Sequence, residues 1–326
     1  MSTQKYRHLE EENSEENFVS DSWGGSWTKE KLDTFEEYVR NVYLKIMNHQ
    51  RDKYNWKLIY LDAFAGSGSR SKGKTLEIKD ALVSIFPKEL LPDEETDVYQ
   101  GAAERVVKIE ESGTRGFDYY YFVDKDKDSL DKLEEKLSIY NPNGRKIYKN
   151  EDANTAITEM ANAMSMNYHF KSLTLLDPFG MQIDWKTIEC LQGLSVDLFI
   201  LIPTGVIINR LLGKDGEIMY PDKLSRCLGM SVDEIKSKFY KSHKENNLFG
   251  ESFDVIDKVK NPCKKIAEEY INKLNSAFKY VTKKPLVLTN SRNVPIYHFV
   301  FASQNENAVK LAQYIINKQK RHGIKN

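Results

Sequence analysis

The sequence lacks the features that place a chain in a membrane or outside the cell. Within its 326 residues no apolar run approaches the roughly 20 residues that a helix needs to cross a bilayer. The first residues also lack the apolar stretch of a secretory signal peptide. We therefore expect a globular, cytoplasmic protein that forms one large domain or one domain with a sizeable insertion.

Cysteine is scarce as well. The chain contains only Cys190, Cys227 and Cys263, and no two of them have the C-x-x-C spacing of a zinc site. An odd number of widely separated cysteines also argues against a disulfide framework. We expect three reduced packing residues and no metal site.

The chain has no net charge, because 48 basic side chains balance 48 acidic ones. The distribution is nevertheless uneven: residues 1–208 carry 26 basic and 36 acidic side chains, whereas residues 209–326 carry 22 and 12. Surface helices can differ in this way by chance. Clustered Lys and Arg residues are also typical of a face that binds nucleic acid.

The most informative stretch begins at residue 58. An apolar run reaches Asp62 and then breaks into Gly66-Ser67-Gly68, a pattern typical of a buried strand that ends in a tight loop. Glycine has no Cβ and accepts positive φ, so such a loop lets main-chain N–H groups approach a nucleotide closely. The loop is therefore the first candidate for a ligand site.

Two cofactors fit this loop. The pattern Asp62-x-Phe64-x-Gly66-x-Gly68 resembles the first motif of class I methyltransferases, which holds S-adenosylmethionine (SAM). The run Gly68–Thr75 fits the phosphate-loop pattern G-x-x-x-x-G-K-T instead. A phosphate loop, however, expects its first glycine directly at the strand end, and a buried acid beside a triphosphate would be repulsive. We therefore prefer SAM.

Strands and helices alternate along most of the chain, which predicts an α/β fold with a mostly parallel sheet. The strands are expected at 57–62, 118–124, 145–149, 173–176 and 196–202, followed by a pair at 286–289 and 296–301. Helices are expected at 28–46, 76–85, 129–140, 157–164, 206–212, 232–239, 267–278 and 307–320. The segment 1–22 is expected to be a flexible acidic tail before one domain, 23–326, which has helical insertions at 87–117 and 213–262.

Acids follow three further strands of this prediction, at Asp124, Asp152 and Asp177. In open α/β sheets ligands bind outside the carboxyl ends of the strands, and an acid after the second strand typically bonds ribose hydroxyls. We assign that role to Asp124, although Asp126 could replace it and a helix N-cap is the simpler alternative. Asp152, with Ala153, is placed where the adenine amino group would lie.

The stretch Asp177-Pro178-Phe179-Gly180 is the candidate site for a methyl acceptor. A carboxylate and backbone carbonyls can accept the N–H bonds of an exocyclic amine while an aromatic ring stacks on its base, and the resulting alignment favours transfer. Asp177, Pro178 and Phe179 suit these roles. The alternatives are a simple strand-ending turn, or Asp177 as the acid that holds Mg²⁺ for a phosphate loop.

The stretches 60–68 and 177–180, together with the opening Trp27-Thr-x-x-Lys31-Leu32, resemble the three-Cys-motif partner protein family, TcmP, over most of the chain. The resemblance implies a Rossmann-like class I methyltransferase fold with a seven-stranded sheet, a bacterial setting, and a partner with a cysteine motif encoded nearby. Asp-Pro-Phe-Gly also resembles the catalytic motif of transfer-RNA guanine N2-methyltransferases. Many amine methyltransferases have Pro and Tyr where this chain has Phe179 and Gly180.

The sequence therefore predicts a SAM-dependent methyltransferase that modifies an exocyclic amine of a nucleic-acid base, in RNA rather than DNA. Two alternatives stay open. One is a phosphate-loop ATPase that uses Lys74, Thr75 and Asp177. The other is a non-catalytic scaffold with a SAM-binding fold that acts by binding its partner.

Overall fold

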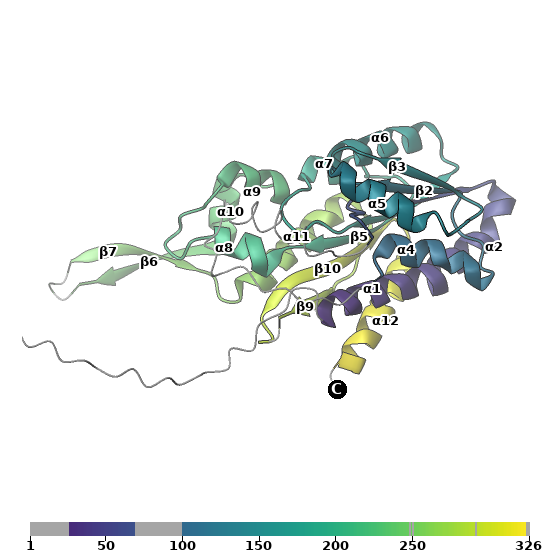
Figure 1. Cartoon of the computed structure of the whole chain (residues 1–326). Helices are drawn as coiled ribbons and strands as arrows, with labels where there is room; N and C mark the ends of the chain where they lie inside the picture. The colour runs from purple at the N-terminus through teal and green to yellow at the C-terminus, as the bar shows by residue number, and fades with distance from the viewer. Residues whose placement is uncertain (1–25, 69–99, 248, 250, 291, 324–326) are drawn as a thin grey trace, which may run out of the picture.

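The computed structural model describes residues 26–68, 100–247, 249, 251–290 and 292–323, so the expected tail at 1–22 lies outside the described residues. These residues form one mixed sheet flanked by helices and a separate hairpin (Figure 1). The strands are β1 (Lys57–Asp62), β2 (Tyr119–Val123), β3 (Arg145–Lys149), β4 (Phe170–Leu176), β5 (Val196–Ile202), β6 (Tyr240–Asn246), β7 (Ser252–Lys258), β8 (Tyr280–Val281), β9 (Leu286–Thr289) and β10 (Pro295–Ser303). The α-helices are α1 (Ser26–Tyr38), α2 (Leu44–Tyr54), α4 (Ala102–Val107), α5 (Lys127–Leu137), α6 (Ala153–Met166), α7 (Trp185–Glu189), α8 (Asn209–Leu211), α9 (Pro221–Leu228), α10 (Val232–Phe239), α11 (Pro262–Ala277) and α12 (Glu306–Gly323). Short π- or 3₁₀-helical turns are η1 (Val39–Tyr43), η3 (Lys108–Ser112) and η4 (Thr204–Ile208).

Among the described residues the main sheet has eight strands in the order β3-β2-β1-β4-β5-β10-β8, and β9 pairs with β10. Strands β1 to β5 are parallel, whereas β10 runs antiparallel to β5. The predicted α/β architecture and mostly parallel sheet are therefore confirmed. The sheet has one strand more than expected, because the two-residue β8 is too short to leave a periodic pattern.

The N-terminal helix covers one face of the sheet. Leu32, Phe35 and Val39 are buried, as the spacing of apolar residues in an amphipathic helix requires. Helix α1 contacts α4 and α12, and α7 contacts α6 and α11. Figure 1 shows α1, α4 and α12 on one side of the sheet and α6 and α7 on the other.

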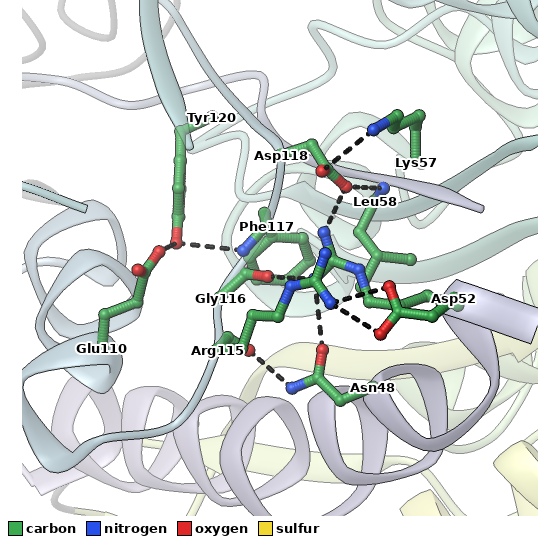
Figure 2. A network of polar contacts seen from close by, with 11 residues as sticks. Asn48, Asp52, Lys57, Leu58, Glu110, Arg115, Gly116, Phe117, Asp118 and Tyr120 are labelled. Atoms are coloured by element: carbon green, nitrogen blue, oxygen red, sulfur yellow. Dashed lines mark hydrogen bonds and ion pairs between the residues drawn. The ribbon is translucent and has the colours of Figure 1, made fainter. Parts of the chain in front are cut away.

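A network of polar contacts closes the amino ends of β1 and β2 (Figure 2). Arg51 of α2 is buried, and its guanidinium donates to Asp118 Oδ2 at 2.5 Å and to the carbonyl oxygen of Gly116 at 2.7 Å. The same oxygen of Asp118 accepts from the backbone N–H of Leu58 at 2.7 Å. The buried Arg51 and the partly buried Asp118 therefore both have partners, which limits the cost of removing their charges from water.

The connection from β1 to β2 contains α4 and η3, which occupy 102–112 of the segment expected as an insertion. Val106, Val107 and Ile109 are buried, so this part of the segment contributes to the core. The helix expected at 76–85 lies outside the described residues.

The segment 213–262 contains α9 and α10, where the sequence predicts helices, and also the hairpin β6–β7. Figure 1 shows the hairpin projecting away from the main sheet. Nearly all of its residues are exposed, so its strands lack the apolar alternation that indicates a strand in a sequence.

The three cysteines are free thiols, as expected. Cys227 is buried, whereas Cys190 is exposed, so the predicted packing role is wrong for Cys190. None of the helices in the described part of the chain is long and apolar enough to cross a membrane.

Candidate functional site

Three acids meet at the carboxyl ends of β2, β1 and β4. Asp62 ends β1 and lies opposite Phe122 of β2 and Leu175 of β4. Asp124 and Asp177 each follow two residues after those partners, so the register brings all three carboxyl groups to one edge of the sheet. The sequence predicted this convergence, and the structure confirms it for these three.

The loop after Asp62 is bonded to both neighbouring strands. The N–H of Ala63 donates to the carbonyl oxygen of Leu175 at 3.2 Å, and the N–H of Ala65 donates to that of Val123 at 2.9 Å. Phe64 is partly buried and packs against the hydrophobic core. The loop therefore lies across the ends of β2 and β4 rather than standing free of the sheet.

Gly66 and Gly68 both have positive φ, +58° and +67°, which favours glycine at each position. A Cβ at Gly66 would meet none of the described residues within 4 Å, so the described part of the chain leaves the loop open on that side. A Cβ at Gly68 would lie 2.6 Å from Cδ1 of Leu133, so α5 packs against the loop there. The first glycine thus faces open space and the second faces the core.

Asp62 is the most buried acid of the group, at 3% exposure. Its Oδ1 accepts from the N–H of Phe64 at 3.2 Å, and its Oδ2 accepts from the hydroxyl of Tyr60 at 3.2 Å. The pKa of Asp62 is raised to about 7, first by burial and then by the negative charges of Asp177 and Asp124, while the two hydrogen bonds lower it. Within the described residues no Lys or Arg forms an ion pair with Asp62.

Asp124 fastens the glycine loop. Its Oδ2 accepts from the N–H of Gly66 at 2.8 Å, and its Oδ1 accepts from the N–H of Asp126 at 2.9 Å. The alternative that Asp124 caps the next helix is wrong, because Asp126 is the N-cap of α5 and accepts from the N–H of Asp128. Asp124 therefore stays at the edge of the site, beside the loop.

Asp152 lies one strand further out, after β3. It is the N-cap of α6 and accepts from the N–H of Asn154 at 2.8 Å, while its other oxygen pairs with Lys125 at 2.8 Å. Partial burial alone would raise the pKa of Asp152, but the contacts with Lys125 and Asn154 hold it below its usual value. Ala153, the first residue of α6, is buried. Asp152 shares the edge with the other acids but contacts none of them.

The stretch after β4 carries the predicted acceptor residues. Asp177 is partly exposed and pairs with the ammonium of Lys31, which reaches it from α1. The ring of Phe179 is 37% exposed, and Pro178 lines a small apolar cavity together with Ile200 and Tyr270. A partly exposed carboxylate is therefore followed two residues later by an exposed aromatic residue.

Sequence reasoning missed several polar and aromatic residues around this stretch. Lys31 entered only as part of a resemblance, because its burial is shown by the structure and not by the apolar periodicity of the helix. At the end of β5 the hydroxyl of Thr204 lies 2.8 Å from Nδ1 of the buried His298. That contact joins residues 94 positions apart in the sequence, so no local sequence pattern indicates it.

No protein-family model matches the chain, and no curated protein matches it either. The resemblance to the TcmP family therefore stays a prediction, and the assignment of a function depends on the geometry of the site.

Proposed function

We propose that the chain is a SAM-dependent methyltransferase with a Rossmann-like class I fold. The proposal depends on one observation, the meeting of Asp62, Asp124 and Asp177 beside a loop with two positive-φ glycines. The strand order supports it, because β1 lies between β2 and β4 and the chain direction of the crossovers changes there. In open α/β sheets the crevice at such a point is the usual ligand site.

The charge at this edge favours SAM over a nucleoside triphosphate. SAM carries a sulfonium and presents hydrogen-bond donors on its ammonium, its ribose and its adenine. Three acids, of which Asp62 is only partly ionised near pH 7, lie with one buried ammonium, that of Lys31, so the edge is attractive to a cation and repulsive to a polyphosphate. The competing phosphate loop needs residues 69–75, which lie outside the described residues.

The residues suit the parts of SAM as follows. Asp62 and the Gly66–Gly68 loop would hold the methionine part, Asp124 the ribose, and Asp152 with Ala153 the adenine. The open side of Gly66 leaves room for a ligand against the backbone. When bound, SAM supplies an electrophilic methyl group. The chain itself supplies placement, since Asp177 can accept an N–H of the acceptor and the ring of Phe179 can stack on its base.

The acceptor that we propose is an exocyclic amine of a nucleic-acid base, in RNA rather than DNA. The excess of basic side chains in residues 209–326 supports a phosphate-bearing partner. A cysteine-motif partner protein is proposed from the family resemblance alone.

Binding calorimetry with S-adenosylhomocysteine (SAH) and with Mg-ATP tests the proposal. We expect SAH to bind, and SAH at 100 times its Kd to stabilise the fold by about 2.7 kcal/mol. Asp124→Asn should weaken SAH binding roughly 10- to 100-fold, or about 1.4 to 2.8 kcal/mol, because a carboxylate acceptor is lost. Asp131→Asn, on the exposed side of α5 where Asp131 pairs with Lys127, is the matched control and should leave the affinity unchanged.

Binding of Mg-ATP without binding of SAH would overturn the assignment in favour of a phosphate-loop ATPase. If SAH binds but labelled methyl from SAM never reaches RNA, DNA or protein, the chain is a non-catalytic SAM-binding scaffold.

A further inference from the structure

Among the described residues Lys31 is the only buried lysine, with 4% exposure. Its ammonium pairs with Oδ2 of Asp177. A buried ammonium is costly unless it is paired, so this contact fixes both side chains. A fixed positive charge thus stands at the place proposed for the methyl acceptor.

Helix α1 also holds the other end of the acceptor stretch. Trp27 precedes Lys31 by one helical turn, and the Lys31 ammonium lies 5.7 Å from the centroid of its ring. Trp27 stacks on Tyr297 with ring centroids 5.4 Å apart, and the hydroxyl of Tyr297 donates to the carbonyl oxygen of Phe179 at 3.4 Å. One face of α1 therefore sets the position of both Asp177 and Phe179.

The arrangement leaves one carboxylate oxygen for a ligand. In the described part of the chain, Oδ1 of Asp177 accepts no hydrogen bond, whereas Oδ2 is held by Lys31. An alkylamine has a pKa near 10.4 and is cationic at pH 7. At Oδ1 of Asp177 it would approach the Lys31 ammonium at short range, and Lys31 already offsets the charge of Asp177, so the attraction that the edge offers a cation elsewhere is weakest at this point. The exocyclic amine of a base is conjugated and neutral, and it can donate an N–H to Oδ1 without that repulsion.

We infer that Lys31 is a positioning residue of the acceptor site and that it restricts the acceptor to amines that are neutral at pH 7. The inference rests on the proposed methyltransferase function and gives a physical reason why its acceptor is a base amine rather than a lysine side chain or a polyamine. In the transfer, the lone pair of the acceptor nitrogen forms the N–CH₃ bond, and the S–CH₃ bond breaks with its electron pair left on sulfur. The nitrogen then loses one proton to solvent, which reaches the site beside the exposed ring of Phe179.

The test compares full-length wild type, Lys31→Met and Lys29→Met, with labelled SAM and two acceptors, mixed-sequence RNA and a lysine-rich peptide. Lys29 is exposed on the same helix, where it pairs with Asp33, so its variant is the matched control. We expect the SAH affinity of each variant to differ from that of wild type by less than about threefold. Lys31→Met should lower transfer to RNA at least tenfold and raise the peptide-to-RNA ratio at least tenfold. Lys29→Met should change neither.

A second measurement does not depend on transfer. In Lys31→Ala, ethylammonium can enter the vacated space and pair with Asp177, so it should raise the melting temperature of this variant more than NaCl at equal ionic strength does. Wild type should not distinguish the two salts. Equal effects of the salts on Lys31→Ala would overturn the role of Lys31.

The outcomes separate the two proposals. Wild type that binds SAH and methylates RNA, with the same acceptor ratio in Lys31→Met, overturns the inference and leaves the proposed function intact. Wild type that binds no SAH, or that binds it without transfer, overturns methyl transfer and the substrate restriction with it.

Discussion

The acids at the two ends of β1 and β2 differ in the partners that compensate their charge. At the amino end Asp118 accepts from the guanidinium of Arg51 and the N–H of Leu58, and Lys57 lies 3.8 Å from its other oxygen (Figure 2). At the carboxyl end Asp62 accepts only a hydroxyl and a backbone N–H from the described residues, and two further acids lie near it. The amino end is electrostatically complete without a ligand, whereas the carboxyl end is not.

This difference separates acids that stabilise the fold from acids that are available for binding. A buried ion pair is costly to break, because removing one partner leaves the other charge without compensation. A cluster of like charges disfavours the ionised form of its members, and the raised pKa of Asp62 is the result. A cationic ligand would relieve that repulsion, so the incomplete end is where binding energy can be gained.

The largest effect is expected at the complete end. Arg51→Met leaves the partly buried carboxylate of Asp118, whose side chain is 18% exposed, without its main cation, so the free energy of unfolding should fall by about 3 kcal/mol. Urea denaturation at pH 7 measures the loss. The matched control is Arg115→Met in the same network, because Arg115 pairs with the exposed Asp52 and its removal should change the stability little. Similar losses in the two variants would contradict the comparison.

A change of opposite sign is expected at the incomplete end. The pKa of Asp62 is about 7 in the folded protein, against roughly 3.9 for an unfolded chain. Between these values the folded state holds a proton that the unfolded state has released, so this group lowers stability as the pH rises from about 4 to about 7. Asp62→Asn removes the effect and should stabilise the ligand-free protein by roughly 1 to 3 kcal/mol at pH 8.

The same substitution should weaken SAH binding, since it removes a charge from the proposed site. Urea titrations of both proteins at pH 5 and pH 8, with and without SAH, measure both effects. A variant that is less stable than wild type at pH 8 would show that Asp62 is a structural acid like Asp118.

Much of this comparison was predictable from the sequence, because strand ends are local events. The apolar runs before Asp62, Asp124 and Asp177 indicate buried parallel strands, and parallel strands place their ends at one edge. The glycines after Asp62 indicate the tight loop for the same local reason.

What the sequence could not predict depends on contacts between distant segments. Lys31 lies 146 residues from Asp177, and nothing near either residue indicates the other. The partners of Asp118 come from another helix and strand, so its sequence neighbourhood does not distinguish it from the acids at the opposite end. The sequence did not predict the hairpin β6–β7, because its paired strands are exposed and show no apolar alternation.

Asp197 provides the smallest and most discriminating test, because it is buried at the amino end of the sheet and forms no ion pair with any described Lys or Arg. It accepts from the hydroxyls of Tyr38 at 2.7 Å and Ser303 at 2.6 Å. Burial raises its pKa to about 6 although both hydroxyls lower it. In Asp197→Asn the loss of a buried charge stabilises the folded state, and the loss of one hydrogen-bond acceptor destabilises it. The two effects oppose each other, so the free energy of unfolding at pH 8 should change by less than about 1 kcal/mol.

The pH range distinguishes this acid from Asp62. The stability of Asp197→Asn relative to wild type should rise from about pH 4 to about pH 6 and then stay constant, because the folded protein has then lost the proton. For Asp62→Asn the relative stability should continue to rise to about pH 7. Neighbouring acids oppose the ionisation of Asp62, whereas two hydroxyl donors favour the ionisation of Asp197. Urea midpoints measured at half-unit intervals of pH separate the two curves. If both curves level off at the same pH, the neighbouring acids do not raise the pKa of Asp62 beyond the effect of burial. The proposed electrostatic difference between the two ends of the sheet would then be wrong.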